Sequence, residues 1–238
     1  MAEREESAYP TRLDNLVSFE VPSSRFAVLL HGLGRSAISM RPVERRLAAH
    51  GYEVFNVDYP STAATIPALA AGIAARLAVW HPGQPLDFIT HSLGGILVRY
   101  AVSAGQFPSS RVRRVVMLGP PSTGSELADQ LPRLAVVGPL YRRFTGPAGL
   151  QLGTNDDAIP ARLPAVNFET GIIAGTRSYN PFFSAILGAP SDGKVRVDRA
   201  AVAGMRDFAT VPYWHPFLMR PASVHALILR FLERGAFR

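Results

Sequence analysis

One serine in the chain stands where a nucleophile is expected. Ser92 lies in the run LDFITHSLGG, between an apolar stretch at 86–90 and a helix-like segment that begins at Gly94. A serine at a sharp strand-to-helix turn exposes its hydroxyl at the sheet edge, and small residues two positions away permit the turn. Gly94 is small, whereas Thr90 stands where glycine is usual. We expect Ser92 to be a nucleophile, and an ordinary glycine turn is the alternative.

A second glycine motif precedes Ser92 in the chain. The segment HGLG, residues 31–34, directly follows the apolar run at 26–30. Acyl transfer places negative charge on an oxygen, and two fixed backbone N–H groups can stabilise it, one after the nucleophile and one from an upstream loop. We expect the N–H groups of Leu33 and Leu93 to form this oxyanion hole. For His31 we expect a structural hydrogen-bonding role.

A nucleophilic serine needs a histidine as general base, and in this topology the histidine comes last in the chain. Of the six histidines, only His215 and His225 follow Ser92 at a distance. His215 lies in VPYWHPFLM, between a strand-like run and the final helix-like segment, whereas His225 lies inside that segment. We expect His215 to be the base and His225 to be a packing or surface residue.

The histidine in turn needs a carboxylate that orients it. Asp192 lies in SDGKV, after the strand-like run at 171–174, and the glycine that follows it suits a tight loop. We expect Asp192 to be this acid. The alternatives are Asp198, Asp207 and, one strand earlier in the chain, Asp156 and Asp157.

The elements that must position these residues alternate along the chain. Short apolar runs read as buried strands, and segments with helical spacing lie between them. This order predicts a single α/β domain over residues 1–238, with a mostly parallel sheet flanked by helices and with residues 1–24 as an N-terminal extension. The expected strands are 26–30, 52–57, 86–90, 114–118, 171–174 and a last one within 201–211, and the expected helices are 38–50, 65–80, 94–104 and 221–234.

Between 121 and 170 the alternation stops. Proline and glycine recur there, with short apolar pieces between them. A long stretch without clear strands is often a functional loop, so we expect a small cap or lid insertion. The part at 131–150 either covers an acyl-binding pocket or is a surface excursion over the sheet, and the sequence leaves both readings open.

Composition narrows the classes of function. The chain is 47% hydrophobic and 18% charged, which predicts a folded core, and the absence of cysteine excludes disulfides, thiolate ligands and a cysteine nucleophile. The net charge of +7 comes mostly from scattered arginines without interleaved aromatic residues, so we do not expect a nucleic-acid partner. Contact with an anionic membrane surface remains open.

The sequence lacks motifs that bind a metal or a dinucleotide, and it lacks segments that insert into a membrane. There is no His-Glu-x-x-His motif or histidine pair at ligand spacing, and HGLGR lacks the third glycine of a dinucleotide fingerprint. The N-terminal run MAEREESAYPTRLDNL is polar, and no window approaches the length of a membrane-spanning helix. We expect a soluble, cytoplasmic protein with no cofactor and no metal.

The chain resembles the α/β-hydrolase superfamily, within it the small bacterial lipases and esterases related to lipase class 2 and to PGAP1-like hydrolases. The matching runs lie within 26–130 and 170–234. They are LLHGLGRS, VDYPST, FITHSLGGILVR, VVMLGPPSTGSELAD, PSDGKVRVDRA and PYWHPFLM.

The resemblance implies an α/β-hydrolase fold and a Ser92–Asp192–His215 triad without a cofactor. The expected activity is hydrolysis of carboxylic esters, with a small-molecule ester or a lipid as substrate. The same triad would serve a thioesterase, an amidase or an acyltransferase, because all share the acyl-enzyme. A non-catalytic scaffold of the same fold is the alternative from another class.

Overall fold

Six parallel strands form one sheet in the order β2-β1-β3-β4-β5-β6. The computed structural model describes residues 25–188 and 190–238, so the expected N-terminal extension lies outside the described residues. The parallel sheet flanked by helices confirms the predicted α/β-hydrolase fold. The strands are β1 (Arg25–Leu30), β2 (Tyr52–Val57), β3 (Leu86–His91), β4 (Val112–Leu118), β5 (Glu169–Gly175) and β6 (Asp207–Val211).

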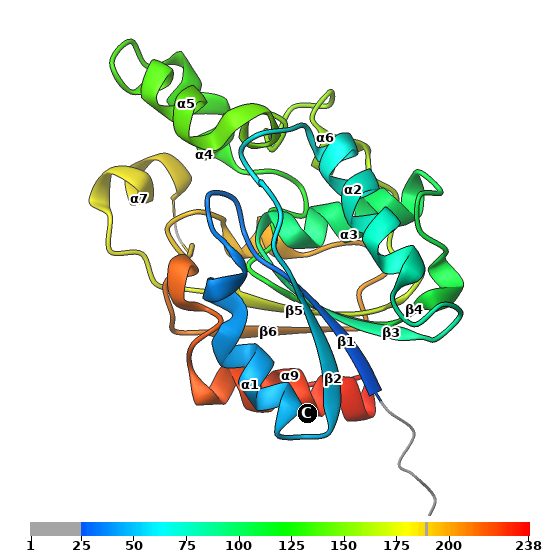
Figure 1. Ribbon diagram of the computed structural model, residues 1–238. Coiled ribbons are helices and arrows are strands. Elements are labelled where there is room, and N and C mark those ends of the chain that lie inside the picture. The colour runs from blue at the N-terminus through cyan, green and yellow to red at the C-terminus, as the bar shows by residue number, and fades with distance from the viewer. Residues whose placement is uncertain (1–24, 189) are drawn as a thin grey trace, which may run out of the picture.

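Helices cover both faces of the sheet (Figure 1). α1 (Arg41–Ala48) and α9 (Ala222–Arg234) lie on one face, and α2 (Ile66–Val79) and α3 (Leu93–Ser103) lie on the other. Each helix buries apolar residues at helical spacing, as Val224, Ile228 and Phe231 do in α9. The sheet is therefore enclosed between two apolar layers.

The carboxyl ends of the central strands lie at one edge of the sheet. Leu30 pairs with Thr90, and Thr90 pairs in turn with Met117. Because β1, β3 and β4 end in register, the loops that follow them open side by side. Open α/β sheets bind ligands at the carboxyl ends of their strands. The glycine motifs at 31–34 and 92–95 lie at this edge.

The segment between β4 and β5 is largely helical, although its proline and glycine content suggested irregular structure. It forms α4 (Glu126–Gln130), a 3₁₀ turn η3 (Leu131–Arg133), α5 (Val137–Leu150) and α6 (Ile159–Arg162). α5 carries a kink at Gly146, whose φ of 60° suits glycine. A Cβ there would lie 1.7 Å from the Thr62 carbonyl oxygen. The glycine thus lets α5 approach the 58–65 loop.

Shorter elements complete the described chain. The last expected strand begins only at Asp207, because 201–206 is a turn. No helix in the described ranges is both long and apolar enough to cross a bilayer. The remaining elements are η1 (Ala37–Met40), η2 (Ser109–Arg111), α7 (Pro181–Leu187), α8 (Val197–Ala200) and η4 (His215–Phe217).

Candidate active site

Ser92 stands at the sharp turn between β3 and α3. Its backbone has φ 54° and ψ −118°, a conformation that non-glycine residues seldom adopt. The turn depends on a close approach, since a Cβ at position 94 would lie 2.7 Å from the Leu30 carbonyl oxygen. Thr90 is accommodated because position 95 is also glycine, where a Cβ would lie 3.3 Å from the threonine hydroxyl.

Asp192 and His215 form a hydrogen-bonded pair beside this turn. Nδ1 of His215 lies 2.7 Å from Oδ2 of Asp192, and the two residues are 6% and 1% exposed. The other carboxylate oxygen of Asp192 accepts hydrogen bonds from the backbone N–H groups of Lys194 and Val195. With Nδ1–H donating to the aspartate, a neutral His215 ring presents Nε2 as an acceptor.

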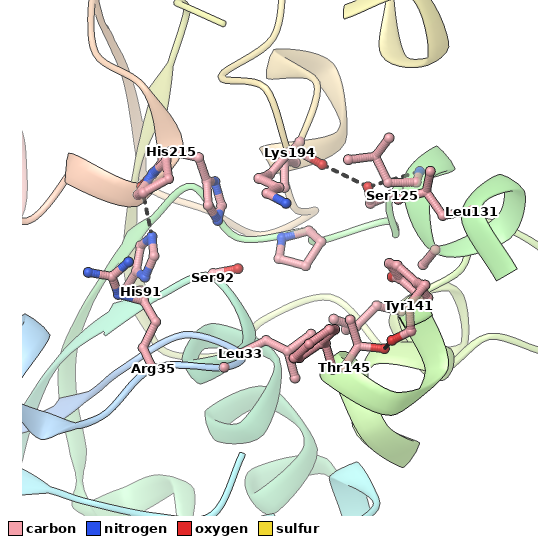
Figure 2. Close-up of a pocket in the computed structure, with 18 residues that line it drawn as sticks. Leu33, Arg35, His91, Ser92, Ser125, Leu131, Tyr141, Thr145, Lys194 and His215 are labelled. Atoms are coloured by element: carbon pink, nitrogen blue, oxygen red, sulfur yellow. Dashed lines mark hydrogen bonds between the residues drawn. The ribbon is translucent and has the colours of Figure 1, made fainter. Parts of the chain in front are cut away.

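A cavity of about 260 Å³ brings the serine and this pair together. Ser92 and His215 both line it, and in Figure 2 the serine oxygen and the histidine ring face the same space. A buried aspartate, a histidine bonded to it and a serine on a strained turn are the parts of a nucleophile activated by a general base.

Two backbone N–H groups near Ser92 are available to an anion. Leu93 is the first residue of α3, so its N–H has no partner within the helix. Leu33 lines the cavity, and no hydrogen bond among the described residues uses its N–H. The loop around Leu33 is held by the bond from Gly34 N–H to Ser61 Oγ, 3.0 Å long. Both groups belong to the loops that were expected to supply an oxyanion hole.

The other candidate histidines are engaged elsewhere. His225 lies in α9 with Nε2 2.9 Å from the Met219 carbonyl oxygen. His31 is fully buried, with Nδ1 2.9 Å from the Gly32 carbonyl oxygen and its ring stacked on Tyr59. Neither His31 nor His225 lines the cavity.

The alternative acids also lie away from His215. Asp198 bonds the Arg196 guanidinium, and Asp207 accepts from the Phe237 backbone N–H. Asp156 and Asp157 are exposed in the segment that precedes α6. Among the described aspartates, only Asp192 is hydrogen-bonded to a histidine that lines the cavity.

His91, which sequence reasoning treated only as part of the turn, supports the base. Its Nε2 lies 3.0 Å from the His215 carbonyl oxygen, and its Nδ1 is buried without a partner in the described part of the chain. Burial lowers the pKa of His91 well below that of a free histidine. The ring is therefore neutral near pH 7, and Nε2–H donates to His215.

The cavity wall is mostly apolar. α4, η3 and α5 supply much of it, including Leu127, Leu131, Tyr141 and Phe144. Burial raises the pKa of Tyr141 to about 12, so its hydroxyl is protonated at neutral pH. Within residues 25–188 and 190–238, no three histidine, aspartate or glutamate side chains gather in a way that could hold a metal ion.

Comparison with known families and structures identifies the family of the chain and proteins of similar fold. A model described as the alpha/beta hydrolase family matches residues 27–234. No curated protein matches the chain by sequence.

Several solved structures are similar in fold. The mature lipase of Bacillus licheniformis has a TM-score of 0.69 and 19% identity, over 90% of this chain and 93% of that chain. A metagenomic carboxyl esterase has a TM-score of 0.60 and 20% identity, over 82% of this chain and 65% of that chain. Lipase B of Aspergillus fumigatus has a TM-score of 0.65 and 16% identity, over 89% of this chain and 53% of that chain. At such identities the likeness shows the fold alone.

Proposed function

The chain belongs to the alpha/beta hydrolase family, and we propose that it is a serine hydrolase of carboxylic esters that acts through an acyl-enzyme on Ser92. One observation carries the proposal: Ser92, on its strained turn, faces the same cavity as the hydrogen-bonded Asp192–His215 pair. In this proposal His215 is the general base and Asp192 the residue that orients it.

The first half-reaction forms the acyl-enzyme. Nε2 of His215 takes the proton of the Ser92 hydroxyl, and the serine oxygen attacks the acyl carbon. The N–H groups of Leu33 and Leu93 stabilise the negative charge on the former carbonyl oxygen, each by about 3 kcal/mol. The imidazolium then gives its proton to the departing alcohol, and Asp192 stabilises the charged ring throughout.

The second half-reaction returns the enzyme to its starting state. His215 takes a proton from water, and the resulting hydroxide attacks the acyl carbon of acyl-Ser92. The ester bond to the serine breaks, the serine oxygen recovers its proton from His215, and the carboxylic acid leaves. The ester and one water molecule balance the two steps, and an alcohol and a carboxylic acid leave.

The lining of the cavity suits an ester with an apolar acyl or alcohol part. The wall from α4, η3 and α5 is mostly apolar, and His91, Ser92 and His215 add polar groups to the lining. The solved structures of similar fold that bear the names lipase or carboxyl esterase support a hydrolase. The ester class itself rests on the chemistry of this cavity.

Labelling with a fluorophosphonate probe and peptide mapping tests the activated serine. We expect modification at Ser92, its loss in Ser92→Ala and slower labelling in His215→Ala. Ser103→Ala is the control, because Ser103 is exposed at the end of α3 and away from the cavity, so this variant should still be labelled. Folded protein that resists the probe with and without detergent would favour the non-catalytic scaffold instead.

A further inference from the structure

Lys194 is the only lysine of the chain, and it lines the cavity beside the proposed acid. Its backbone is held on both sides. Its N–H donates to Oδ1 of Asp192 at 3.0 Å, and its carbonyl oxygen accepts from the Ser125 hydroxyl at 2.7 Å. The loop of the acid and the start of α4 thus fix the position from which this side chain extends.

The Lys194 side chain is half-buried and directs its amine into the cavity (Figure 2). Nζ lies 4.5 Å from the centre of the Phe183 ring. Burial lowers the pKa of Lys194, and the negative charge of Asp192 opposes that shift. Among the described residues, no carboxylate oxygen lies within 4.0 Å of Nζ, and no hydrogen bond uses it.

The nearest negative charge, on Asp192, already accepts hydrogen bonds from other groups. The Asp192 carboxylate bonds the His215 ring through one oxygen and backbone N–H groups through the other. The Phe183 ring offers a cation–π contact on one side of the ammonium, but it accepts no conventional hydrogen bond. A partly desolvated ammonium is stabilised most by a hydrogen bond to an anionic acceptor. Such an acceptor can bind in the cavity beside Nζ.

A second cation lines the same cavity on the other side of Ser92. Arg35 has a buried Nε without a partner in the described part of the chain. In Figure 2 its guanidinium lies beside the His91 ring, whereas the Lys194 amine points into the open part of the cavity. Two cations therefore line the cavity around Ser92, and Lys194 is the one whose amine faces a ligand within it.

We propose that Lys194 is a specificity-determining residue that binds an anionic group, a carboxylate or a phosphate, carried by the ester substrate. This inference rests on the proposed function, because it names the substrate class of the same site. The anion lies either on the acyl chain or on the alcohol. In both cases it forms a charge-assisted hydrogen bond with Nζ.

Two pairs of esters matched in acyl length test the proposal. 4-Nitrophenyl hemisuccinate against 4-nitrophenyl butyrate places a carboxylate on the acyl side. Butyrylglycerol 3-phosphate against butyrylglycerol places a phosphate on the alcohol side. For each pair we measure the ratio of kcat/KM for the anionic ester to that for the neutral one, which cancels general effects on the catalytic step.

We expect Lys194→Met to lower this ratio at least about tenfold for one of the two pairs, and Lys194→Arg to restore most of it. The pair that responds identifies the side of the substrate that carries the anion. Added salt should also lower the wild-type ratio. Lys194→Gln is the second neutral variant if the methionine variant does not fold.

Two further variants serve as controls. Arg46→Met removes one positive charge from the exposed surface of α1, and the ratio should stay at the wild-type value. Arg35→Met tests the rival cation. A ratio within about twofold of wild type in Lys194→Met, or a loss that appears in Arg35→Met instead, would overturn the assignment to Lys194. Lys194 would then only anchor α7 through Phe183.

Binding without turnover separates this inference from the proposed function. Calorimetry on Ser92→Ala measures binding of monomethyl succinate and of butyl phosphate. We expect binding of at least one ligand, and its loss in Ser92→Ala/Lys194→Met. If the ligands bind in a lysine-dependent way but no ester is hydrolysed, the anion-binding role of Lys194 stands and the esterase proposal is overturned. If esters are hydrolysed but binding does not depend on Lys194, the esterase proposal stands and the anion-binding role of Lys194 is overturned.

Discussion

At the residue scale, the site depends on backbone conformations that the neighbouring glycines permit. A non-glycine residue at φ 54° costs of order 1–3 kcal/mol and persists only where its surroundings hold it in place. Here the Ser92 N–H donates to the Leu118 carbonyl oxygen at 2.9 Å, and Gly94 lies against β1. The strain therefore serves to expose the serine hydroxyl at the sheet edge.

The Asp192 carboxylate should matter through the tautomer of His215. Asp192→Asn keeps the shape but can donate to Nδ1, which would leave Nε2 protonated and unable to accept the serine proton. We expect kcat to fall roughly 10³–10⁴-fold with little change in fold. Steady-state kinetics on 4-nitrophenyl butyrate measures this. Asp198→Asn is the control, and an equal loss there would place the acid elsewhere.

His91 should make folding stability sensitive to acid. Burial lowers its pKa in the folded protein below 6.5, so below about pH 6.5 the unfolded chain binds a proton that the folded one does not. The free energy of unfolding should therefore fall on acidification from about pH 7.5 to about pH 5.5. His31, also with a lowered pKa through burial, acts in the same direction.

Urea unfolding at a series of pH values measures this effect. His91→Gln should weaken the dependence on pH, because the variant has one titrating group fewer. His50→Gln is the control, because it removes an exposed histidine that lies outside the buried site. An unchanged slope in His91→Gln would mean that other groups cause the loss of stability in acid.

At the element scale, glycines allow α5 and the turn at Ser92 to lie against other segments. These close contacts are not part of the regular hydrogen bonding of helices and strands. The α5 kink lies against the Thr62 carbonyl, and the amino end of α3 lies against β1. The helices between β4 and β5 form a wall of the cavity, which favours the first reading of 131–150, a cover over the site. That this segment acts as a lid and binds acyl chains remains a prediction.

Two glycine variants in helices should have opposite effects. Gly146→Ala forces a Cβ against the Thr62 carbonyl at positive φ, and we expect a loss of about 2 kcal/mol or more in the free energy of unfolding. Gly72→Ala, in the exposed interior of α2 with open space around it, should gain about 0.5–1 kcal/mol. Chemical denaturation measures both. A neutral Gly146→Ala would show that α5 can shift away from Thr62.

The wall from η3 should set the preferred acyl length. Leu131 is buried and lines the cavity, so Leu131→Trp should fill part of the space. We expect the ratio of kcat/KM for 4-nitrophenyl octanoate to that for the acetate to fall about tenfold. Leu134→Trp is the control, because Leu134 is partly exposed and does not line the cavity. Equal ratios in wild type and Leu131→Trp would favour the surface-excursion reading.

At the scale of the whole molecule, the net charge of +7 favours anionic surfaces. α5 and its N-cap residue Val136 expose the apolar side chains of Val136, Leu140 and Phe144, next to Arg142 and Arg143. An apolar strip with adjacent arginines is suited to the surface of an anionic bilayer. Composition left contact with such a surface open, and the strip on α5 makes it a prediction.

Vesicle sedimentation measures that contact. We expect binding to phosphatidylglycerol vesicles at low salt, weaker binding at high salt and little binding to phosphatidylcholine vesicles. Arg142→Glu/Arg143→Glu should reduce the binding more than the same charge change at Arg45 and Arg46 on α1. Equal reduction by both pairs would attribute the effect to net charge rather than to α5.

The sequence alone determined the alternation of strands and helices outside 121–170 and the parallel sheet, because these follow from local hydrophobic spacing and from glycine at tight turns. The family was indicated by the resemblance of the chain's motifs. The chain's assignment to the lipase class 2 and PGAP1-like group remains a prediction. The tertiary structure decided which distant residues meet. Sheet register and loop path bring Asp192 to His215 and leave Asp198, Asp207 and His225 elsewhere. The helices of 121–170 and the place of Lys194 in the cavity depend on contacts between segments far apart in the chain, which local patterns do not record.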